Sequence, residues 1–285
     1  MAAFLTKVMV FLMAGCATLD PVVIDSEYEN RWEQWKTQLN QNRIKYVQLF
    51  GLVKINPGIN QIGASNSNEI QLAYPGMPDY LGTLTFDGET MAFGSNPDLE
   101  ITLEDQAVQS LDLSFDPIGY SQTLHYKSFD WFINKRKDGY YFRIRDLDNP
   151  AVASFNGFDF YPASEKWIVK ADYHTFDPPK IEKVLNVLGT TLPLKFVGYY
   201  TFQVNGQSYQ VDALEGGFIM FSDLTNGNST YEWRYMYVDP LTKPLYLDFN
   251  TSYNPPCSYS KYTTCDKPPL QNKLPLPVEA GEKYN

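Results

Sequence analysis

Histidine is scarce in this chain: only His125 and His174 occur among its 285 residues. A structural zinc site takes about four nitrogen or sulfur ligands, and a Ser-His-Asp triad needs a histidine beside its nucleophile. The sequence also lacks an H-E-x-x-H motif, a G-x-S-x-G motif and the glycine-rich loops that bind nucleotide phosphates. We therefore expect no metal site and no cofactor, and we interpret both histidines as structural residues in or near strands.

Positive charge is also in deficit, because 23 Lys and Arg residues face 33 Asp and Glu residues, for a formal net charge of -10. Nucleic-acid binding needs a concentrated basic surface, and docking to anionic lipid by charge alone needs one too. The composition therefore argues against a nucleic-acid partner. It leaves the identity of any small-molecule or protein partner unknown.

The N-terminal apolar run is too short to span a bilayer as a permanent helix, which takes about 20 residues. It extends from Val8 to Ala14, follows Lys7 and ends just before Cys16, as in a signal peptide. Residues 13–16, Met-Ala-Gly-Cys, resemble a lipobox, in which the cysteine is lipidated. We expect a signal peptide over residues 1–15 and a lipidated tether over residues 16–25.

The residue after the lipobox is Ala17 rather than aspartate, which resembles sorting to the outer membrane in didermal bacteria. We therefore expect an exported protein, anchored to the membrane through lipid at Cys16 and facing the periplasm. Two alternatives stay open. An ordinary signal peptidase could cleave the leader, or the segment could be a buried strand with a core cysteine.

Only two further cysteines occur, Cys257 and Cys265. An exported chain meets an oxidising compartment, so two thiols eight positions apart predict a disulfide. A metal site is the competing interpretation, and the shortage of histidine disfavours it.

One helix is predicted near the N-terminus. Ser26 and Glu29 have the spacing of a capping box, which marks a helix start. Steps of four, three and four residues then predict an apolar stripe, formed by Tyr28, Trp32, Trp35 and Leu39. We expect this stripe of about four turns to pack on a sheet. Ligand stacking by the tryptophans is the alternative.

The rest of the chain favours strands. It contains 21 Tyr and 18 Phe, which pack well in sheets. Dipeptides typical of tight hairpins separate strand-like segments at Asp87-Gly88, Asp138-Gly139, Asn205-Gly206 and Asn226-Gly227. We predict an all-β protein with one N-terminal amphipathic helix. Residues 26–148 form a helix plus a β-sandwich-like half, and residues 149–285 form a β-meander or barrel-like half with a disulfide-pinned tail rich in Pro, Asn and Tyr.

The tail contains a distinctive series of motifs: Asp248-Phe249-Asn250, Tyr253-Asn254-Pro255-Pro256-Cys257 and Ala280-Gly281-Glu282. With these motifs the chain resembles the domain-of-unknown-function 1684 family, over roughly residues 28–283. The resemblance implies no activity, because none is assigned to this family. Residues 60–72 also resemble the glycine turn of a forkhead-associated β-sandwich, but Ala64 stands where the phosphate-binding version has arginine.

The same tail contains the candidate site. Asp248 and Asn250 lie two apart and so share one face of a strand. If the disulfide folds the tail back, further polar residues could converge on them, giving the candidate ligand-binding set Arg234, Asp248, Asn250, Tyr253, Asn254, Asn272 and Glu282. Two interpretations stay open. The set could form a polar pocket, or it could provide hydrogen-bond partners for the backbone of a tail without strands.

These patterns predict an uncharacterised exported lipoprotein of the cell envelope. The leading hypothesis is a non-enzymatic binding or structural module with a polar pocket near the tail. The alternative is a hydrolase that uses Asp248 and Glu282 as a carboxylate pair. Carboxyl groups buried against backbone amides would favour the first hypothesis.

Overall fold

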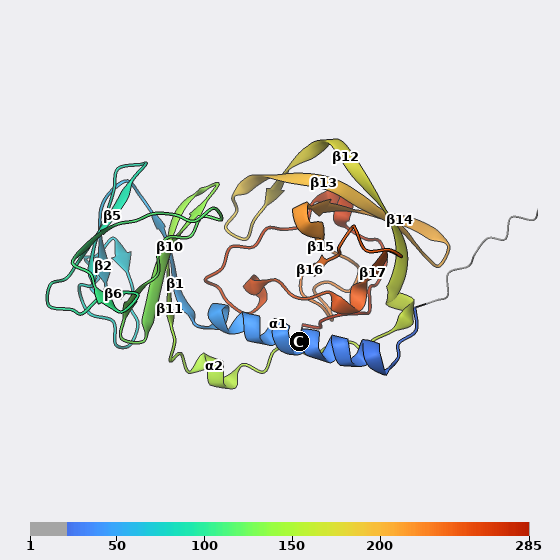
Figure 1. Ribbon diagram of the computed structural model, residues 1–285, viewed down its shortest axis with the longest axis horizontal. Coiled ribbons are helices and arrows are strands. Elements are labelled where there is room, and N and C mark those ends of the chain that lie inside the picture. The colour runs from blue at the N-terminus through green and yellow to red at the C-terminus, as the bar shows by residue number, and fades with distance from the viewer. Residues whose placement is uncertain (1–21, 285) are drawn as a thin grey trace, which may run out of the picture.

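The computed structural model describes residues 22–284, so the predicted signal peptide, Cys16 and most of the expected tether lie outside the described residues. Figure 1 shows two β-rich halves beside each other, with helix α1 (Ser26–Val47) along one edge of the C-terminal half. Within the described part of the chain, no helix combines the length and the apolar composition of a membrane span. The predicted fold class, mostly β with one long N-terminal helix, is confirmed.

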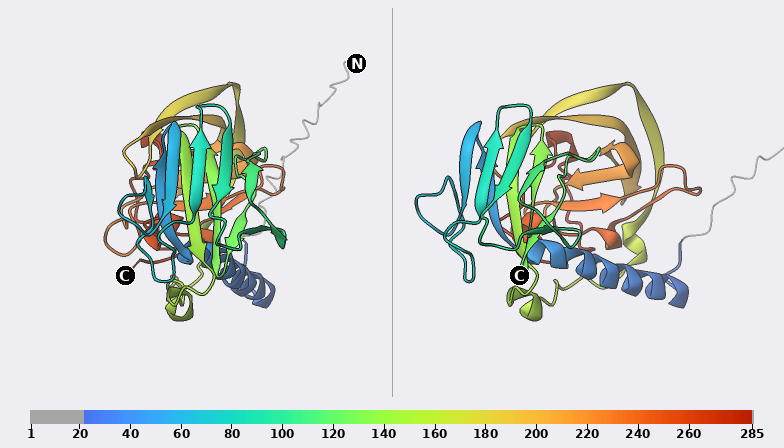
Figure 2. Two further views of the ribbon diagram at one scale, coloured as in Figure 1. Left: turned by 90° about the vertical axis from the view of Figure 1, so that its left-hand side faces the viewer. Right: turned by 60° about the vertical axis from the view of Figure 1, so that its left-hand side comes forward.

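The N-terminal half is a sandwich of two sheets, and the left view of Figure 2 looks onto it. One sheet has the order β1-β11-β10-β9-β6-β7, with bounds Leu49–Ile55, Gly139–Asp146, Phe129–Arg136, Leu124–Tyr126, Thr102–Leu103 and Gln106–Ala107. The other has the order β3-β2-β4-β5-β8, with bounds Ile70–Gln71, Gly58–Gly63, Gly82–Phe86, Met91–Ser95 and Ser110–Asp112. Aliphatic and aromatic side chains fill the space between the sheets. Phe93 of β5 contacts Trp131 of β10 with ring centroids 4.6 Å apart.

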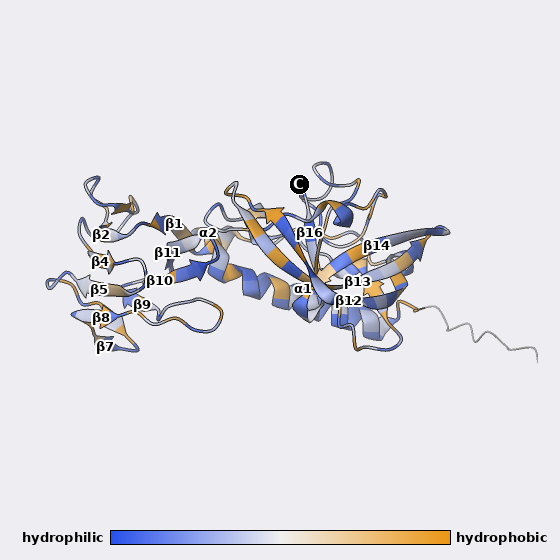
Figure 3. Cartoon of the chain, turned by 90° about the horizontal axis from the view of Figure 1, so that it is seen from above, coloured by the Kyte–Doolittle hydropathy of each residue, from blue (hydrophilic) through white to orange (hydrophobic). Residues whose placement is uncertain are grey.

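The C-terminal half is built on an antiparallel meander. Its main sheet has the order β14-β13-β12-β17, with bounds Gln207–Leu214, Thr191–Val204, Ile168–Leu185 and Tyr246–Asp248. A second sheet pairs β15 (Phe218–Phe221) with β16 (Arg234–Tyr237), and none of these sheets closes on itself. The long β12–β13 arm arches over this half in Figure 1, and the alternating hydropathy of its residues appears as banding in Figure 3.

Short helical elements connect and complete these sheets. Helix α2 spans Ala151–Ser154, and single 3-10 turns occur at η1 (Glu165–Trp167), η2 (Glu215–Gly217), η3 (Phe249–Thr251), η4 (Pro256–Ser258) and η5 (Leu270–Asn272). The last three lie in the tail, which has no strand after β17. A second apolar core lies under the meander and includes the fully buried Tyr200 and Leu247.

Three of the four predicted hairpins form: β4–β5, β10–β11 and β13–β14. At β4–β5 the turn is longer than predicted, because four residues rather than two separate the paired Phe86 and Met91. The prediction of a tight turn at Asn226-Gly227 is wrong. Strands β15 and β16 do pair, but their register ends at Phe221 and Arg234, so residues 222–233 form a long loop. Inside this loop Asn226 donates from its amide to the Tyr231 carbonyl at 2.6 Å. That side-chain bond stabilises a wider loop than the dipeptide suggested.

Helix α1 also differs in detail from the sequence prediction. Its N-cap is Asp25, whose carboxylate accepts the Tyr28 amide at 2.8 Å, so Ser26 is already helical. The tryptophan stripe does not pack on a sheet. Trp32 and Trp35 contact Phe160 edge to face at 6.0 and 5.8 Å, and the Trp32 indole donates to the Asn250 carbonyl at 3.1 Å. The helix therefore packs on the tail and on the segment that precedes β12.

Candidate functional site

The tail after β17 is held against the body by backbone hydrogen bonds. Ser222 donates to Asn272 at 3.1 Å, and Leu274 donates back to Ser222 at 2.7 Å. Farther along, Glu282 donates to Ser252 at 2.9 Å, and Gly281 accepts from Tyr161 at 2.9 Å. The tail thus obtains its backbone partners without forming a regular sheet.

Cys257 and Cys265 form the predicted disulfide, with their Cα atoms 6.1 Å apart. The loop that they close packs beside α1 and the β15–β16 sheet. The Cys265 carbonyl accepts from Val187 at 3.0 Å, at the end of the β12–β13 arm. The disulfide therefore fixes a segment that lies between the arm and the rest of the C-terminal half.

Glu282 is the centre of the first polar cluster. Its carboxylate accepts two hydrogen bonds from Arg43 of α1, at 2.5 and 2.6 Å, and a third from the Asn254 amide at 2.7 Å. Both charged side chains are almost completely buried. Burial raises the pKa of Glu282, while the Arg43 guanidinium and the Asn254 amide act in the opposite direction. The arrangement joins α1 to the end of the tail.

Asp248 and Asn250 form a second cluster at the start of the tail. Asp248 accepts from the Tyr28 hydroxyl at 2.9 Å and from the Asn250 backbone amide at 3.1 Å. The Asn250 side chain exchanges hydrogen bonds with the backbone of Ser164, at 3.0 and 3.1 Å. Burial raises the pKa of Asp248, and its hydrogen bonds partly offset that shift.

Asn272 and Arg234 lie apart from these clusters. Asn272 accepts from the Asp212 amide at 2.7 Å and donates to the Asp212 and Met220 carbonyls, both at 2.8 Å. It therefore connects β14 to β15. Arg234 pairs with Asp223 at 2.6 Å and donates to the tail carbonyls of Val278, at 2.9 Å, and of Ala280.

Of the seven predicted residues, Tyr253 lines a cavity beside α1. Its backbone exchanges two hydrogen bonds of 2.9 Å with Tyr235. Its ring lines a cavity of about 380 Å³ together with Arg43, Tyr46, Tyr237 and Tyr259. The predicted set thus occupies several places in the C-terminal half rather than one open pocket.

Arg43 and Asp223, which sequence reasoning missed, supply the opposite charges for Glu282 and Arg234. Arg43 could have been found, because it continues the apolar stripe one helical step after Leu39.

A larger cavity, of about 440 Å³, lies between the two halves, and we call it the central cleft. Its charged lining consists of Lys135, Arg136, Lys137, Arg143 and Asp266. Its apolar lining includes Leu192, Leu194, Phe218 and Met220. Tyr46, Phe218, Tyr235 and Pro256 line both this cleft and the cavity beside Tyr253.

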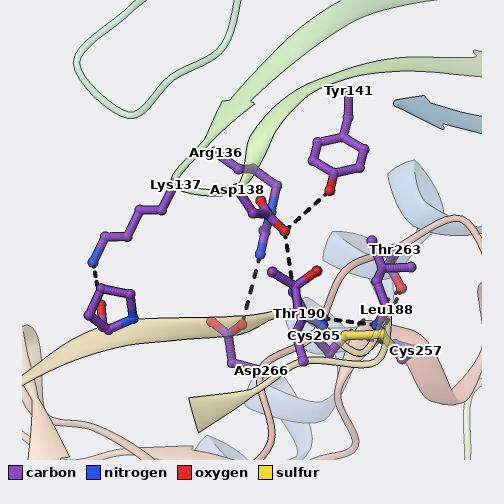
Figure 4. Close-up of polar contacts among 12 residues, drawn as sticks. Arg136, Lys137, Asp138, Tyr141, Leu188, Thr190, Cys257, Thr263, Cys265 and Asp266 are labelled. Atoms are coloured by element: carbon purple, nitrogen blue, oxygen red, sulfur yellow. Dashed lines mark hydrogen bonds and ion pairs between the residues drawn. A yellow bond between two sulfur atoms is a disulfide. The ribbon is translucent and has the colours of Figure 1, made fainter. Parts of the chain in front are cut away.

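Figure 4 shows how the two halves meet at the central cleft. Arg136 and Lys137, at the β10–β11 turn, point toward the C-terminal half, where Asp266 lies next to the disulfide. Lys137 donates to the Pro193 carbonyl of the β12–β13 arm at 2.7 Å. Arg136 lies 3.3 Å from Asp138 and 3.8 Å from Asp266. The sequence contained a signal for this surface, the basic run Lys135-Arg136-Lys137 before a hairpin turn.

Within residues 22–284, no group of three or more His, Cys, Asp and Glu side chains is arranged to hold a metal ion. His125 contacts Asp130 at 2.5 Å, and His174 contacts Thr201 at 3.0 Å. Both histidines lie within strands, β9 and β12, as expected.

Comparison with known proteins assigns a family to the C-terminal half. Residues 153–283 match the family model described as "Protein of unknown function (DUF1684)". This segment belongs to the DUF1684 family. The predicted recognition is confirmed over these residues, whereas residues 28–152, to which the resemblance was extended, lie outside the match. No curated protein matches the chain.

Several solved structures resemble parts of the chain. An uncharacterized protein of Haloarcula marismortui, solved by NMR, is 28% identical with a TM-score of 0.39, over 47% of this chain and 80% of that one. A structure of an FHA domain studied for phosphothreonine-dependent interactions is 16% identical with a TM-score of 0.21, over 33% of this chain and 92% of that one. Rv1747 FHA-1 of Mycobacterium tuberculosis is 15% identical with a TM-score of 0.22, over 34% and 95%. Similarities at this level say nothing about the function of the DUF1684 segment.

Proposed function

We propose that this protein is a lipid-anchored module of the cell envelope that binds a small molecule in the central cleft and has no catalytic activity of its own. The observation that supports the proposal is a cavity of about 440 Å³ between the two halves, beside the disulfide-linked tail. Its size lies in the range of ordinary ligand sites, which occur preferentially where domains meet.

The hydrogen bonds of the polar tail residues support a structural role for these residues. Asp248 accepts from the Asn250 amide, and Glu282 accepts from the Asn254 amide and from Arg43. A glycosidase-type hydrolase needs two carboxyl groups on either side of a substrate bond. Here each carboxyl group is instead bonded to backbone of the tail. In our proposal these groups fix the tail, and the tail forms one wall of the cleft.

Ligand binding can be tested with the protein recovered from the cell envelope. Native mass spectrometry of the wild-type protein should find a bound small molecule. Thr264→Trp places an indole in the cleft and should abolish this adduct, because Thr264 is a half-buried lining residue. Leu188→Trp is the matched control, since Leu188 is exposed on the adjacent arm and does not line the cleft. An adduct that survives Thr264→Trp, or no adduct in the wild type, contradicts the proposal.

The membrane anchor requires a separate test. Cells that express the protein should incorporate radiolabelled palmitate into it, and Cys16→Ala should remove the label and release the protein from the membrane fraction. Cys257→Ala provides the control, because this cysteine belongs to the disulfide. Labelling that Cys16→Ala leaves unchanged contradicts the lipoprotein assignment without affecting the binding proposal.

A further inference from the structure

Three arginines are buried in the described part of this protein, and one of them differs from the others. Arg43 pairs with Glu282, and Arg234 pairs with Asp223. Arg143 of β11 is only 6% exposed, yet no carboxylate of the described residues lies within ion-pair distance of it. Buried charges are ordinarily paired, because taking a guanidinium out of water costs several kcal/mol.

The Arg143 side chain has very little else to bind. Among residues 22–284 its one hydrogen bond runs from Nη2 to the Tyr262 carbonyl, at 3.3 Å, and its buried Nε has no partner. Burial lowers the pKa of Arg143, but a guanidinium remains protonated in proteins. Its side chain lines the central cleft, so a charged donor with unused hydrogen-bonding capacity lies at the wall of a cavity.

Two further basic side chains, those of Arg136 and Lys137, line the cleft beside the acidic Asp266. Arg136 lies near the carboxylates of Asp138 and Asp266, at 3.3 and 3.8 Å, whereas Lys137 donates to the Pro193 carbonyl and has no carboxylate of the described residues within ion-pair distance. Lys135 also lines the cleft, but its ammonium lies over the rings of Phe115 and Tyr140, at 5.9 and 5.6 Å, on the face of the sheet that packs on the sandwich core. Arg143 and Lys137 thus place two positive charges without a paired carboxylate at the cleft, which favours an anion in this cavity.

The opposite wall of the cleft is apolar. It includes Leu192 and Leu194 from the arm and Met220 from β15. A bare inorganic anion would make no contact with these side chains. An anion with a hydrocarbon part would satisfy both walls, because the head group pairs with the guanidinium and the hydrocarbon covers the apolar side chains.

We infer that the central cleft binds a small amphipathic anion, with its carboxylate or phosphate group on Arg143 and its hydrocarbon part against Leu192, Leu194 and Met220. This inference rests on the proposed ligand-binding function and specifies its chemical class. Arg143 acts as a binding residue, and the bidentate geometry of guanidinium with carboxylate or phosphate suits both head groups.

The test compares charged and neutral probes of equal chain length by calorimetry. Octanoate and octyl phosphate distinguish the two head groups, and octanamide is the uncharged analogue. Wild-type protein should bind at least one of the two anions about ten- to hundredfold more tightly than octanamide, since a hydrogen bond to a charged group is stronger than one to a neutral group. Arg143→Gln should lose this preference.

Arg145→Gln is the matched control. Arg145 lies two residues farther along the same strand and so projects from the same face, but it pairs with Asp130 at 3.4 Å and does not line the cleft. Arg145→Gln changes the net charge by the same amount as Arg143→Gln and should leave the affinity for the anions unchanged. Equal binding of anions and octanamide, failure of both anions to bind, or unchanged binding in Arg143→Gln overturns the inference.

Thermal unfolding without ligand provides a second readout. Removing an unpaired buried charge should leave the melting temperature of Arg143→Gln unchanged or raise it by about 2–4 °C. A marked decrease would show that Arg143 supports the fold instead, and would also overturn the inference. If octanamide binds as tightly as the anions and Thr264→Trp abolishes both, the binding proposal holds and only the ligand class is wrong.

Discussion

Arg43 near the end of α1 and Glu282 in the tail form a two-point ion pair, at 2.5 and 2.6 Å, with both side chains inaccessible to solvent. The pair connects segments separated by 239 residues in the sequence. Because Glu282 also accepts the Asn254 amide, the helix and both ends of the tail meet at one carboxylate. The relationship explains how a tail without strands keeps a defined path.

Breaking this pair should destabilise the protein strongly. Arg43→Met leaves Glu282 buried without its counter-charge, and we expect a loss of about 3–5 kcal/mol in the free energy of unfolding. Glu282→Gln should also be costly, since Arg43 then lacks its partner. The double variant should lose clearly less than the sum of the two single losses. Urea unfolding of all four proteins measures the coupling, and additive losses would show that the pair does not act as a unit.

Asp248 should give stability a distinctive pH dependence. Because its pKa is raised in the folded protein, the native state binds this proton more readily than the unfolded chain does. The resulting stabilisation is present below the unfolded pKa, roughly pH 4, and is lost as pH rises through the folded pKa. Relative to Asp248→Asn, the wild type should therefore lose stability as pH increases from about 3.5 to 7.

Asp87 provides a control of opposite sign. Hydrogen bonds from the Thr90 hydroxyl and from the Glu89 and Thr90 amides lower the pKa of Asp87 to about 2. Its stabilisation is present above the unfolded pKa and is lost as pH falls, so the wild type should gain stability over Asp87→Asn as pH increases. Chemical unfolding across this pH range checks both slopes. Slopes of the same sign for the two variants would be incompatible with these environments.

The fold was largely predictable because local signals were strong. Asp-Gly and Asn-Gly dipeptides specify tight hairpins by their backbone preference, and three of these hairpins form. The fourth prediction failed at Asn226 because side-chain bonds to Thr230 and Tyr231 close a wider loop. Local sequence does not reveal such a loop.

The site was less predictable because it depends on how distant segments meet. The tail motifs identified residues that matter, but their partners lie on α1, β14 and the loop before β16. Arg43 belongs to a helical stripe that otherwise consists of aromatic and aliphatic residues, and only the position of the helix shows that Glu282 opposes it. The central cleft lies between the halves, so no single segment contains its pattern. In the sequence Arg143 looks like an ordinary strand residue. Only the structure shows that it is buried and that no carboxylate of the described residues pairs with it.

The disulfide should contribute measurable stability. In the chain-entropy account, a bond between cysteines separated by 8 residues stabilises the protein by roughly 2–3 kcal/mol. Cys257→Ala combined with Cys265→Ala should reduce the free energy of unfolding by about that amount. Alkylation of the native wild-type protein, followed by mass measurement, should find neither thiol free. Complete labelling of both cysteines would show that the bond does not form in the cell.

The backbone of the tail motif Ala280-Gly281-Glu282 requires glycine at its central position, and this requirement supports a final prediction. Its φ angle is +72°, and a Cβ atom built on it would lie 2.5 Å from the Ser252 carbonyl oxygen. Ser252 is the residue that accepts the Glu282 amide, so this close approach positions the buried carboxylate. Gly281→Ala should therefore strain the backbone and also push the tail away from Ser252.

Gly227 separates the two effects, because it has the same φ angle of +72° but nothing within 4 Å of its Cβ position. Gly227→Ala should cost only the left-handed backbone strain, about 1–2 kcal/mol. Gly281→Ala should cost a further 1–3 kcal/mol, roughly the price of overpacking. Part of that excess should disappear in the Arg43→Met background, where Glu282 has already lost its partner. Equal losses for the two glycine variants would mean that the tail can shift without cost, contrary to the close fit between Gly281 and Ser252.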